Sequence, residues 1–116
     1  MTDTEAAAVS RAIALFHEPE PRYSECRAST EWYGWRQEGD RTGWFCRSHR
    51  EPEIAMRLLK AEKLTLECQG DTWIAGQRWF NGTVSMLANS AEADNPEDAI
   101  ALAFCQANNV NVKEAE

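Results

Sequence analysis

Residues 51–109 read EPEIAMRLLKAEKLTLECQGDTWIAGQRWFNGTVSMLANSAEADNPEDAIALAFCQANN, and this stretch holds most of the apolar residues available for a core. It opens with Glu51-Pro52-Glu53, where proline suits the first position of a helix and acids favour its positive end. Apolar residues then recur on one side at helical spacing as far as Ala61. A second helix is predicted to start at Asn95-Pro96, an N-cap followed by a first-turn proline, and to stop at Asn108-Asn109.

Three strands are predicted between these helices, because the intervening segments alternate apolar and polar residues or are rich in strand-forming types. They are residues 64–68, 72–77 with 78–80 as an extension, and 83–88 running on towards Ala91. Gln69-Gly70-Asp71 is a turn sequence, and Asn81-Gly82 is the strongest hairpin signal in the chain. We therefore expect an α+β fold in which both helices pack on one face of a three-stranded antiparallel meander.

Four motifs follow the first helix in a characteristic order. They are Leu-Thr-Leu-Glu-Cys (64–68), Asp-Thr-Trp-Ile-Ala (71–75), Ala-Asn-Ser-Ala-Glu-Ala (88–93) and Asn-Pro-Glu-Asp-Ala-Ile-Ala-Leu-Ala-Phe (95–104). This order, between Glu53 and Ala107, resembles the phage ABA-sandwich domain family, which comprises small phage and prophage proteins of unknown function. The resemblance implies a fold and a phage or prophage origin, and its motifs are structural rather than catalytic.

The same order of helices and strands occurs in double-stranded RNA-binding domains, which meet phosphates with lysines at the start of the last helix. Here that place holds four acids, which would repel RNA: Glu92, Asp94, Glu97 and Asp98. The net charge is −7, and residues 51–116 carry eleven acids against five basic groups. This balance argues against nucleic acid as a partner and permits a basic protein.

At 116 residues the chain is expected to form a single domain, residues 1–116. We divide it into an N-terminal helix (1–17), a connector with a hairpin (18–50), the helix-meander-helix core (51–109) and a tail (110–116). No apolar run approaches the roughly 20 residues of a membrane span, and the acidic N-terminus does not resemble a signal peptide. A cytoplasmic location, in a bacterial host, is the expectation.

The connector is rich in tryptophan and arginine, the residue types enriched at binding hot spots. The candidates for such a patch, on predicted hairpin arms at 31–37 and 43–47, are Trp32, Trp35, Arg36, Arg41 and Trp44. The favoured interpretation is that most of these rings are buried against the core. The alternatives are a patch that faces a protein partner and, less favoured, stacking on single-stranded nucleic acid.

A zinc site is a second hypothesis for the connector. Cys46 and His49 have the Cys-x-x-His spacing, and His17 and Cys26 could complete a tetrahedral set. Only one pair is closely spaced, so the competing interpretation is a surface His49 with cysteines packed beside the hairpin. Neither histidine has a serine or an acid in a recognisable catalytic arrangement in the sequence.

Other chemistry-bearing residues are assigned to structural roles. Cys68 and Cys105 fall at core-like positions, and a nucleophilic role is not favoured for Cys105. Trp73 and Trp79 are predicted to be core or partly buried. The acids at 92, 94, 97 and 98 are interpreted as strand-end and helix-capping acids on a wet edge.

The sequence thus predicts a non-enzymatic accessory protein, without cofactor, that binds a host protein through Glu92–Asp98 or through the tryptophan- and arginine-rich hairpin. Inhibition of a nucleic-acid-handling defence complex is one form this could take. One alternative is a small zinc-containing domain or enzyme built on Cys26, Cys46 and His49. Another is a homodimer or larger homo-oligomer, formed by exposed tryptophans or by the edge of the third strand.

Overall fold

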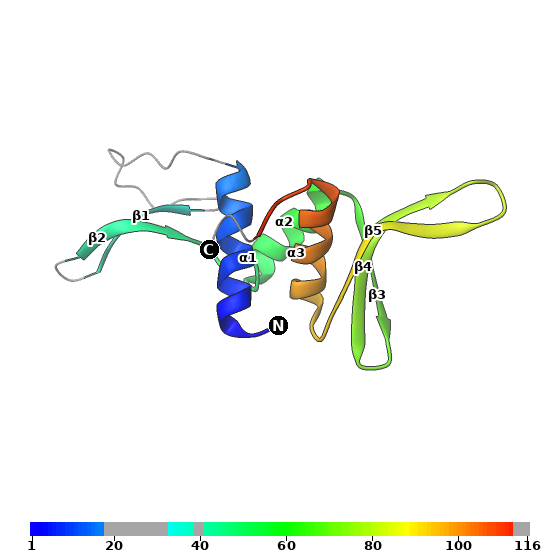
Figure 1. Ribbon diagram of the computed structural model, residues 1–116, viewed down its shortest axis with the longest axis horizontal. Helices are drawn as coiled ribbons and strands as arrows, with labels where there is room; N and C mark the ends of the chain where they lie inside the picture. The colour runs from blue at the N-terminus through cyan, green and yellow to red at the C-terminus, as the bar shows by residue number, and fades with distance from the viewer. Residues whose placement is uncertain (18–32, 39–40, 113–116) are drawn as a thin grey trace.

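The computed structural model describes residues 1–17, 33–38 and 41–112, with the side chains described in 1–17 and 47–112 (Figure 1). Its elements, in chain order, are α1 (Asp3–His17), β1 (Tyr33–Glu38), β2 (Arg41–Cys46), α2 (Pro52–Ala61), β3 (Leu64–Gln69), β4 (Thr72–Phe80), β5 (Ser85–Ala93) and α3 (Pro96–Ala107). The predicted α+β fold is confirmed.

The sheet is an antiparallel meander in the order β3-β4-β5, in which Ala75 lies between Leu66 and Ala91 on the two neighbouring strands. All three helices lie on one side of this sheet (Figure 1). α3 packs on the sheet, and α1 and α2 both contact α3. Because α3 buries Ala99, Ala101 and Ala103 completely, it can approach the sheet and the other helices closely.

One core cluster joins the helices to the sheet. Leu58, Ile100 and Phe104 are all buried in it, as the amphipathic patterns of α2 and α3 predict. α1 contributes Val9 and Ile13 to the same cluster. The core-forming segment therefore extends beyond residues 51–109, because α1 covers a side of α3 that the sheet and α2 leave open.

The predicted signals at the ends of α3 are confirmed. Asn95 caps its start, since the Asn95 side chain accepts a hydrogen bond from the backbone N–H of Asp98. Asn109 has a φ of 54°, the left-handed conformation that ends a helix.

The first two strands form a separate antiparallel hairpin, in which Trp35 pairs with Trp44 along the backbone. The aromatic hairpin that the sequence predicts is therefore present. Among the helices in the described part of the chain, none is both long and apolar enough to cross a bilayer.

Strands β4 and β5 are longer than β3. The pairing of β3 with β4 ends at Gln77, whereas β4 and β5 stay paired as far as Phe80 and Ser85. Residues 78–87 therefore form a two-stranded ribbon, here called the arm, which extends away from the helices and from β3 (Figure 1).

The turn of the arm differs from the predicted Asn81-Gly82 turn by one residue. Asn81 donates its backbone N–H to the carbonyl of Val84 at 3.2 Å, so the two central residues are Gly82 and Thr83. Gly82 has a φ of 93°, a conformation that a residue with a side chain rarely adopts. The third strand consequently begins at Ser85 and not at Thr83.

Candidate functional site: a buried polar network and an exposed apolar arm

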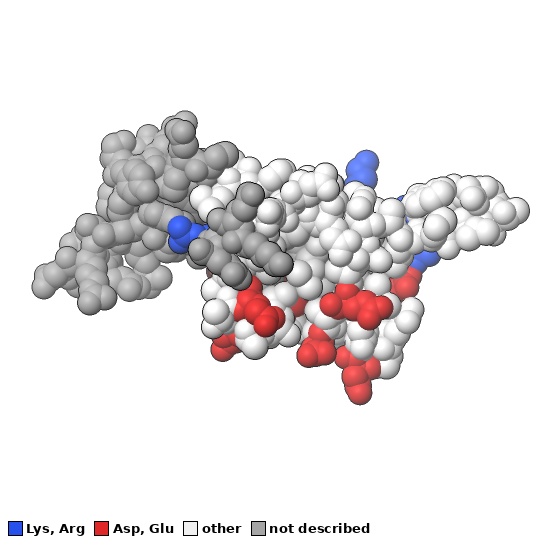
Figure 2. All heavy atoms as spheres, in the orientation of Figure 1, with Lys and Arg blue, Asp and Glu red and all other residues white. Residues whose placement is uncertain are grey.

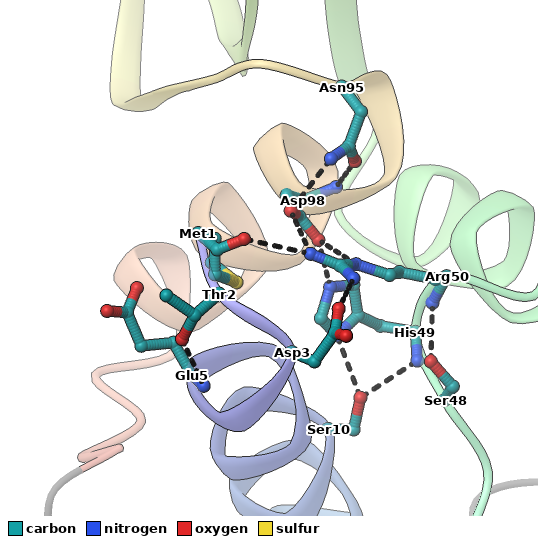
Figure 3. A network of polar contacts seen from close by, with 10 residues as sticks. All are labelled: Met1, Thr2, Asp3, Glu5, Ser10, Ser48, His49, Arg50, Asn95 and Asp98. Carbon is teal, nitrogen blue, oxygen red and sulfur yellow. Dashed lines mark hydrogen bonds and ion pairs between the residues drawn. The ribbon is translucent and has the colours of Figure 1, made fainter.

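A chain of hydrogen bonds joins three segments that lie far apart in the sequence (Figure 3). Ser10 comes from α1, His49 from the segment before α2, and Asp98 from the first turn of α3. Ser10 Oγ lies 2.8 Å from His49 Nδ1, and His49 Nε2 lies 2.5 Å from Asp98 Oδ1. The three residues are 5%, 1% and 1% exposed.

The acceptor-only character of a carboxylate fixes the direction of these bonds. His49 Nε2–H donates to Asp98, and in the neutral ring Nδ1 accepts from the Ser10 hydroxyl. The Ser10 oxygen also accepts the backbone N–H of His49 at 2.9 Å. This network is therefore oriented from α1 through His49 to α3.

Asp98 is held by the start of its own helix. Its backbone N–H donates to Asn95 Oδ1 at 2.9 Å, and Asn95 Nδ2 donates to Asp98 Oδ2 at 2.8 Å. An acid in the first turn also interacts favourably with the positive end of the helix dipole. The local sequence Asn95-Pro96-Glu97-Asp98 thus orients the Asp98 carboxylate through contacts within the first turn of α3, independently of His49 and Arg50.

Arg50 completes the network. Its Nε and Nη2 atoms lie 3.1 and 3.0 Å from the two carboxylate oxygens of Asp98, a bidentate pair. Nη1 donates to Asp3 at 2.9 Å, and Nη2 also donates to the carbonyl of Met1 at 3.2 Å. Hydrogen bonds to Asp98 and then Asp3 raise the pKa of Arg50. Arg50 therefore ties the start of the chain to α3.

Two opposing effects set the pKa of Asp98. Burial favours the neutral acid and by itself would raise the pKa, but the hydrogen bonds from Arg50, His49 and Asn95 outweigh it. The pKa is lowered from 3.8 to about 2, so Asp98 is a carboxylate at neutral pH.

A surface hollow of about 300 Å³, here called the α1 hollow, opens beside this network. It is lined by Asp3, Ala6, Ala7, Ser10, Ser48 and Arg50. The order serine, histidine, aspartate is the one that activates a serine nucleophile, and Ser10 reaches the wall of the hollow. However, every buried side-chain polar atom in the described residues already has a partner within the chain. The same hydrogen bonds therefore also have a structural role, because they connect α1 to α3 and leave no buried polar atom of the three side chains unpaired.

The predicted acidic residues do not share one environment. Glu92 and Asp94 are exposed at the end of β5, and Glu97 is half-buried. Asp98 is buried, so its predicted position on a wet edge is wrong: it faces His49 and Arg50, away from solvent.

Acidic side chains gather over one end of the molecule (Figure 2). In the same orientation, the start of α1, the β3–β4 turn and the β5–α3 junction lie at this end (Figure 1). The first turn of α1 and the β5–α3 junction carry Asp3, Glu5, Glu92, Asp94 and Glu97, here called the acidic end.

The proposed zinc ligands are only partly described. The surface position expected for His49 is wrong, because both of its ring nitrogens are engaged inside the protein. His17 Nδ1 lies 2.9 Å from the Ile13 carbonyl, and its ring stacks on Phe104. Cys26 and the Cys46 side chain lie outside the described residues. Within the residues that the structure describes, no three histidine, cysteine or acidic side chains are grouped to hold a metal ion.

The tryptophan- and arginine-rich patch stays a prediction. Trp32 lies outside the described residues. Trp35 and Arg36 lie on β1, and Arg41 and Trp44 on β2, with side chains outside the described part.

Of the cysteines assigned to the core, Cys105 is buried, and burial raises the pKa of its thiol to about 11. Cys68 is exposed, so the core position predicted for it is wrong. Cys68 lies at the end of β3, beside the Gly70 turn, where no helix covers the strand.

The arm exposes large apolar side chains. Trp79 is 47% exposed, Phe80 67%, Val84 52% and Met86 45%. Of the two positions predicted for Trp79, core or partly buried, the core position is wrong and the residue is at most partly buried, because β4 extends beyond the end of β3 at this point.

Both faces of the arm are apolar. Trp79 pairs with Met86 on one face, and Phe80 and Leu87 lie on the other, since successive strand residues point to opposite faces. The only charged residue in the arm is Arg78, which pairs with Glu67 on β3.

The base of the arm is a bend. Pairing between β4 and β5 shifts between Ala75 and Gln77, a bulge that contains Gly76, and Asn89 on the facing strand has a φ of 52°. A Cβ on Gly76 would lie 3.2 Å from the carbonyl oxygen of Ala88. The Asn89 side chain donates to Gln77 at 2.9 Å, which holds the two strands together at the bend.

No family model, curated protein or solved structure matches this chain. The resemblance to the phage ABA-sandwich family therefore stays a prediction.

Proposed function

We propose that this chain is a protein-binding module and that the arm is its contact surface. The observation that carries the proposal is the exposure of Trp79, Phe80, Val84 and Met86 on one short ribbon. Contiguous apolar patches of this kind mark interaction sites, and tryptophan is enriched at the residues that dominate binding energy.

The form of the arm supports the same function. A two-stranded hairpin is at best marginally stable alone in water. In an antiparallel ribbon with a free face, the exposed face is commonly polar, but here both faces carry apolar residues. A partner that covers the arm would therefore stabilise it and remove its rings from water.

The resemblance and the charge together suggest what such a module serves. We propose a phage- or prophage-type accessory protein, not an enzyme, that acts on a host protein, with a nucleic-acid-handling defence complex as one such target. The acidic end offers complementarity to a basic protein surface and would speed the encounter. Direct contact with nucleic acid is disfavoured by the net charge of −7.

Affinity capture tests the proposal. Purified chain would be immobilised and exposed both to host lysate and to a free, tagged copy of itself, in parallel with a Trp79→Ser, Phe80→Ser variant. Met56→Ser is the matched control, because Met56 is 49% exposed on α2, away from the arm. We expect wild type and control to retain a protein that the arm variant loses. If all three chains retain the same proteins, the arm is not the contact surface.

A second candidate function rests on the Ser10–His49–Asp98 hydrogen bonds beside the α1 hollow. They are arranged as in a serine hydrolase, in which histidine takes the hydroxyl proton as the oxygen attacks an ester carbonyl. It ranks second because Ser10 is only 5% exposed and its oxygen already accepts the His49 N–H. A fluorophosphonate probe followed by mass spectrometry would test it, with Ser10→Ala as control. Absence of an adduct on Ser10 would eliminate this candidate.

A further inference from the structure

We infer that the partner seated on the arm is a second copy of this chain, and that each copy inserts its arm into a hollow beside α3 of the other. The inference rests on the proposed function, because it names the occupant of the same surface. Its first observation is a hollow of about 690 Å³, here called the α3 hollow. Its wall combines the apolar residues Leu102, Cys105, Val110 and Val112 with four uncharged amide residues.

The arm and the α3 hollow carry little charge, which favours them as the surfaces through which two copies make contact. Two chains of net charge −7 repel each other, so contact between copies is favoured where the facing surfaces carry little like charge. The arm has one charged residue, Arg78, which is already paired with Glu67. Among the described residues, none that lines the α3 hollow is charged. The arm and the α3 hollow therefore meet without bringing like charges together.

The position of the α3 hollow suits a reciprocal exchange. Asn89, at the base of the arm, also lines the hollow, so the two surfaces adjoin each other in every copy. A two-fold axis near this base places each arm over the hollow of the other copy, and the two arms beside each other. One face of each arm then packs in the hollow and the other on the neighbouring arm, which accounts for an arm that is apolar on both faces.

The available area is that of a stable dimer. The four exposed arm side chains offer roughly 400 Å² of apolar surface per copy, within the range of patches that serve binding. With one face of each arm in a hollow and the other face on the neighbouring arm, the reciprocal contact buries roughly 1,200 Å², at the lower end of the range for specific interfaces.

Sedimentation equilibrium tests the state of assembly. The wild-type chain and Met56→Ser are expected to sediment as dimers that dissociate on dilution. The Trp79→Ser, Phe80→Ser variant is expected to be a monomer at every concentration. Gln106→Arg, which changes an exposed residue lining the α3 hollow and leaves the arm intact, should weaken dimerisation at least tenfold. If the arm variant still dimerises as wild type does, the inference is wrong. It is also wrong if Gln106→Arg leaves the dimerisation constant unchanged.

A photo-crosslink locates the contact. Benzoylphenylalanine in place of Trp79 or of Phe80, in a mixture of ¹⁵N-labelled and unlabelled chains, probes the two faces of the arm separately. One substitution should give heavy-to-light crosslinks to residues 102–112, and the other should give them to residues 78–87 of the other copy. Crosslinks within one copy, or none to residues 102–112 from either position, would refute the arrangement.

The outcomes separate the inference from the proposed function. A wild-type monomer whose arm variants still lose a captured lysate protein would end the inference and leave protein binding by the arm standing. If the wild-type chain is a monomer and the arm variants capture the same lysate proteins as wild type, both the inference and the proposed function are wrong.

Discussion

At the start of α3 a carboxylate is 1% exposed, whereas at the tip of the arm a phenylalanine is 67% exposed. Asp98 is surrounded by donors from Asn95, His49 and Arg50, so the charge that it buries is fully compensated within one copy of the chain. Phe80 and Trp79 extend past β3, and within the described residues no third strand lies beside them. The first region is complete in the monomer, whereas the second exposes its apolar side chains, and we propose that another protein covers them.

This difference separates two kinds of substitution. Changes in the buried network should reduce the stability of each copy, because they leave a donor or a charge without its partner. Changes in the arm should leave that stability nearly unaltered and act on association.

Asp98→Ala should give the largest loss. It removes the acceptor of His49 Nε2–H and of the Arg50 guanidinium together, and breaking a buried ion pair costs about 3–5 kcal/mol. Urea denaturation followed by circular dichroism measures the change. Asp94→Ala, an exposed acid four residues earlier, should cost no more than about 0.5 kcal/mol. Equal losses in the two variants would show that the network contributes little.

Acidification should give the next largest loss. Asp98 binds its proton less readily in the folded state, with a pKa of about 2, than at its ordinary value of 3.8. The unfolded state therefore binds more protons, and stability falls as the pH drops through this window, by about 2.5 kcal/mol for a carboxyl with such a shift. Thermal denaturation at a series of pH values would measure it. Asp98→Asn should flatten this part of the profile, whereas an unchanged slope in that variant would assign the loss to other acids.

Gly76→Ala should cost about 1–2 kcal/mol. The new Cβ would lie 3.1 Å from Ser90 Cβ and 3.2 Å from the Ala88 carbonyl oxygen, so the strands must move apart at the base of the arm. Thr83→Ala, in the exposed turn of the arm, is the control. Hydrogen exchange at Gln77 and Asn89 should speed up in the glycine variant alone. Unchanged exchange there would mean that the bend tolerates a side chain.

Phe80→Ser should have the smallest effect on the monomer, below about 0.5 kcal/mol, because an exposed side chain has little burial to lose. Urea denaturation at a concentration where the chain is monomeric measures it. A loss as large as that of Asp98→Ala would mean that Phe80 packs within its own chain. The comparison between the two regions would then fail.

The elements that could be predicted from the sequence are those whose signals lie close together in the sequence. Helical spacing and the Asn95-Pro96 cap predict α3, and the apolar stripe behind Pro52 predicts α2. The arm is a different case, because strand propensity does not say where a neighbouring strand ends. The usable signal in the sequence was the extension of the second predicted strand through residues 78–80, beyond the length of the first predicted strand at 64–68.

The buried network could not be predicted from local pattern. His49 is 39 residues from Ser10 and 49 from Asp98, and no motif links the three. Asp98 in particular has the sequence context of a capping acid, which it is, but the same position also faces α1 once the helices pack. Only tertiary packing determines which capping acids become buried.

The contact between α1 and α3 has a consequence for how the protein is made. α1 is translated well before α3, so the apolar side of α1, with Val9 and Ile13, has no α3 to cover it until residues 96–107 have been synthesised. The packing of α1 on α3 should therefore form only after α3 has left the ribosome. Until then, a chaperone that shields the emerging N-terminal segment would protect it from aggregation.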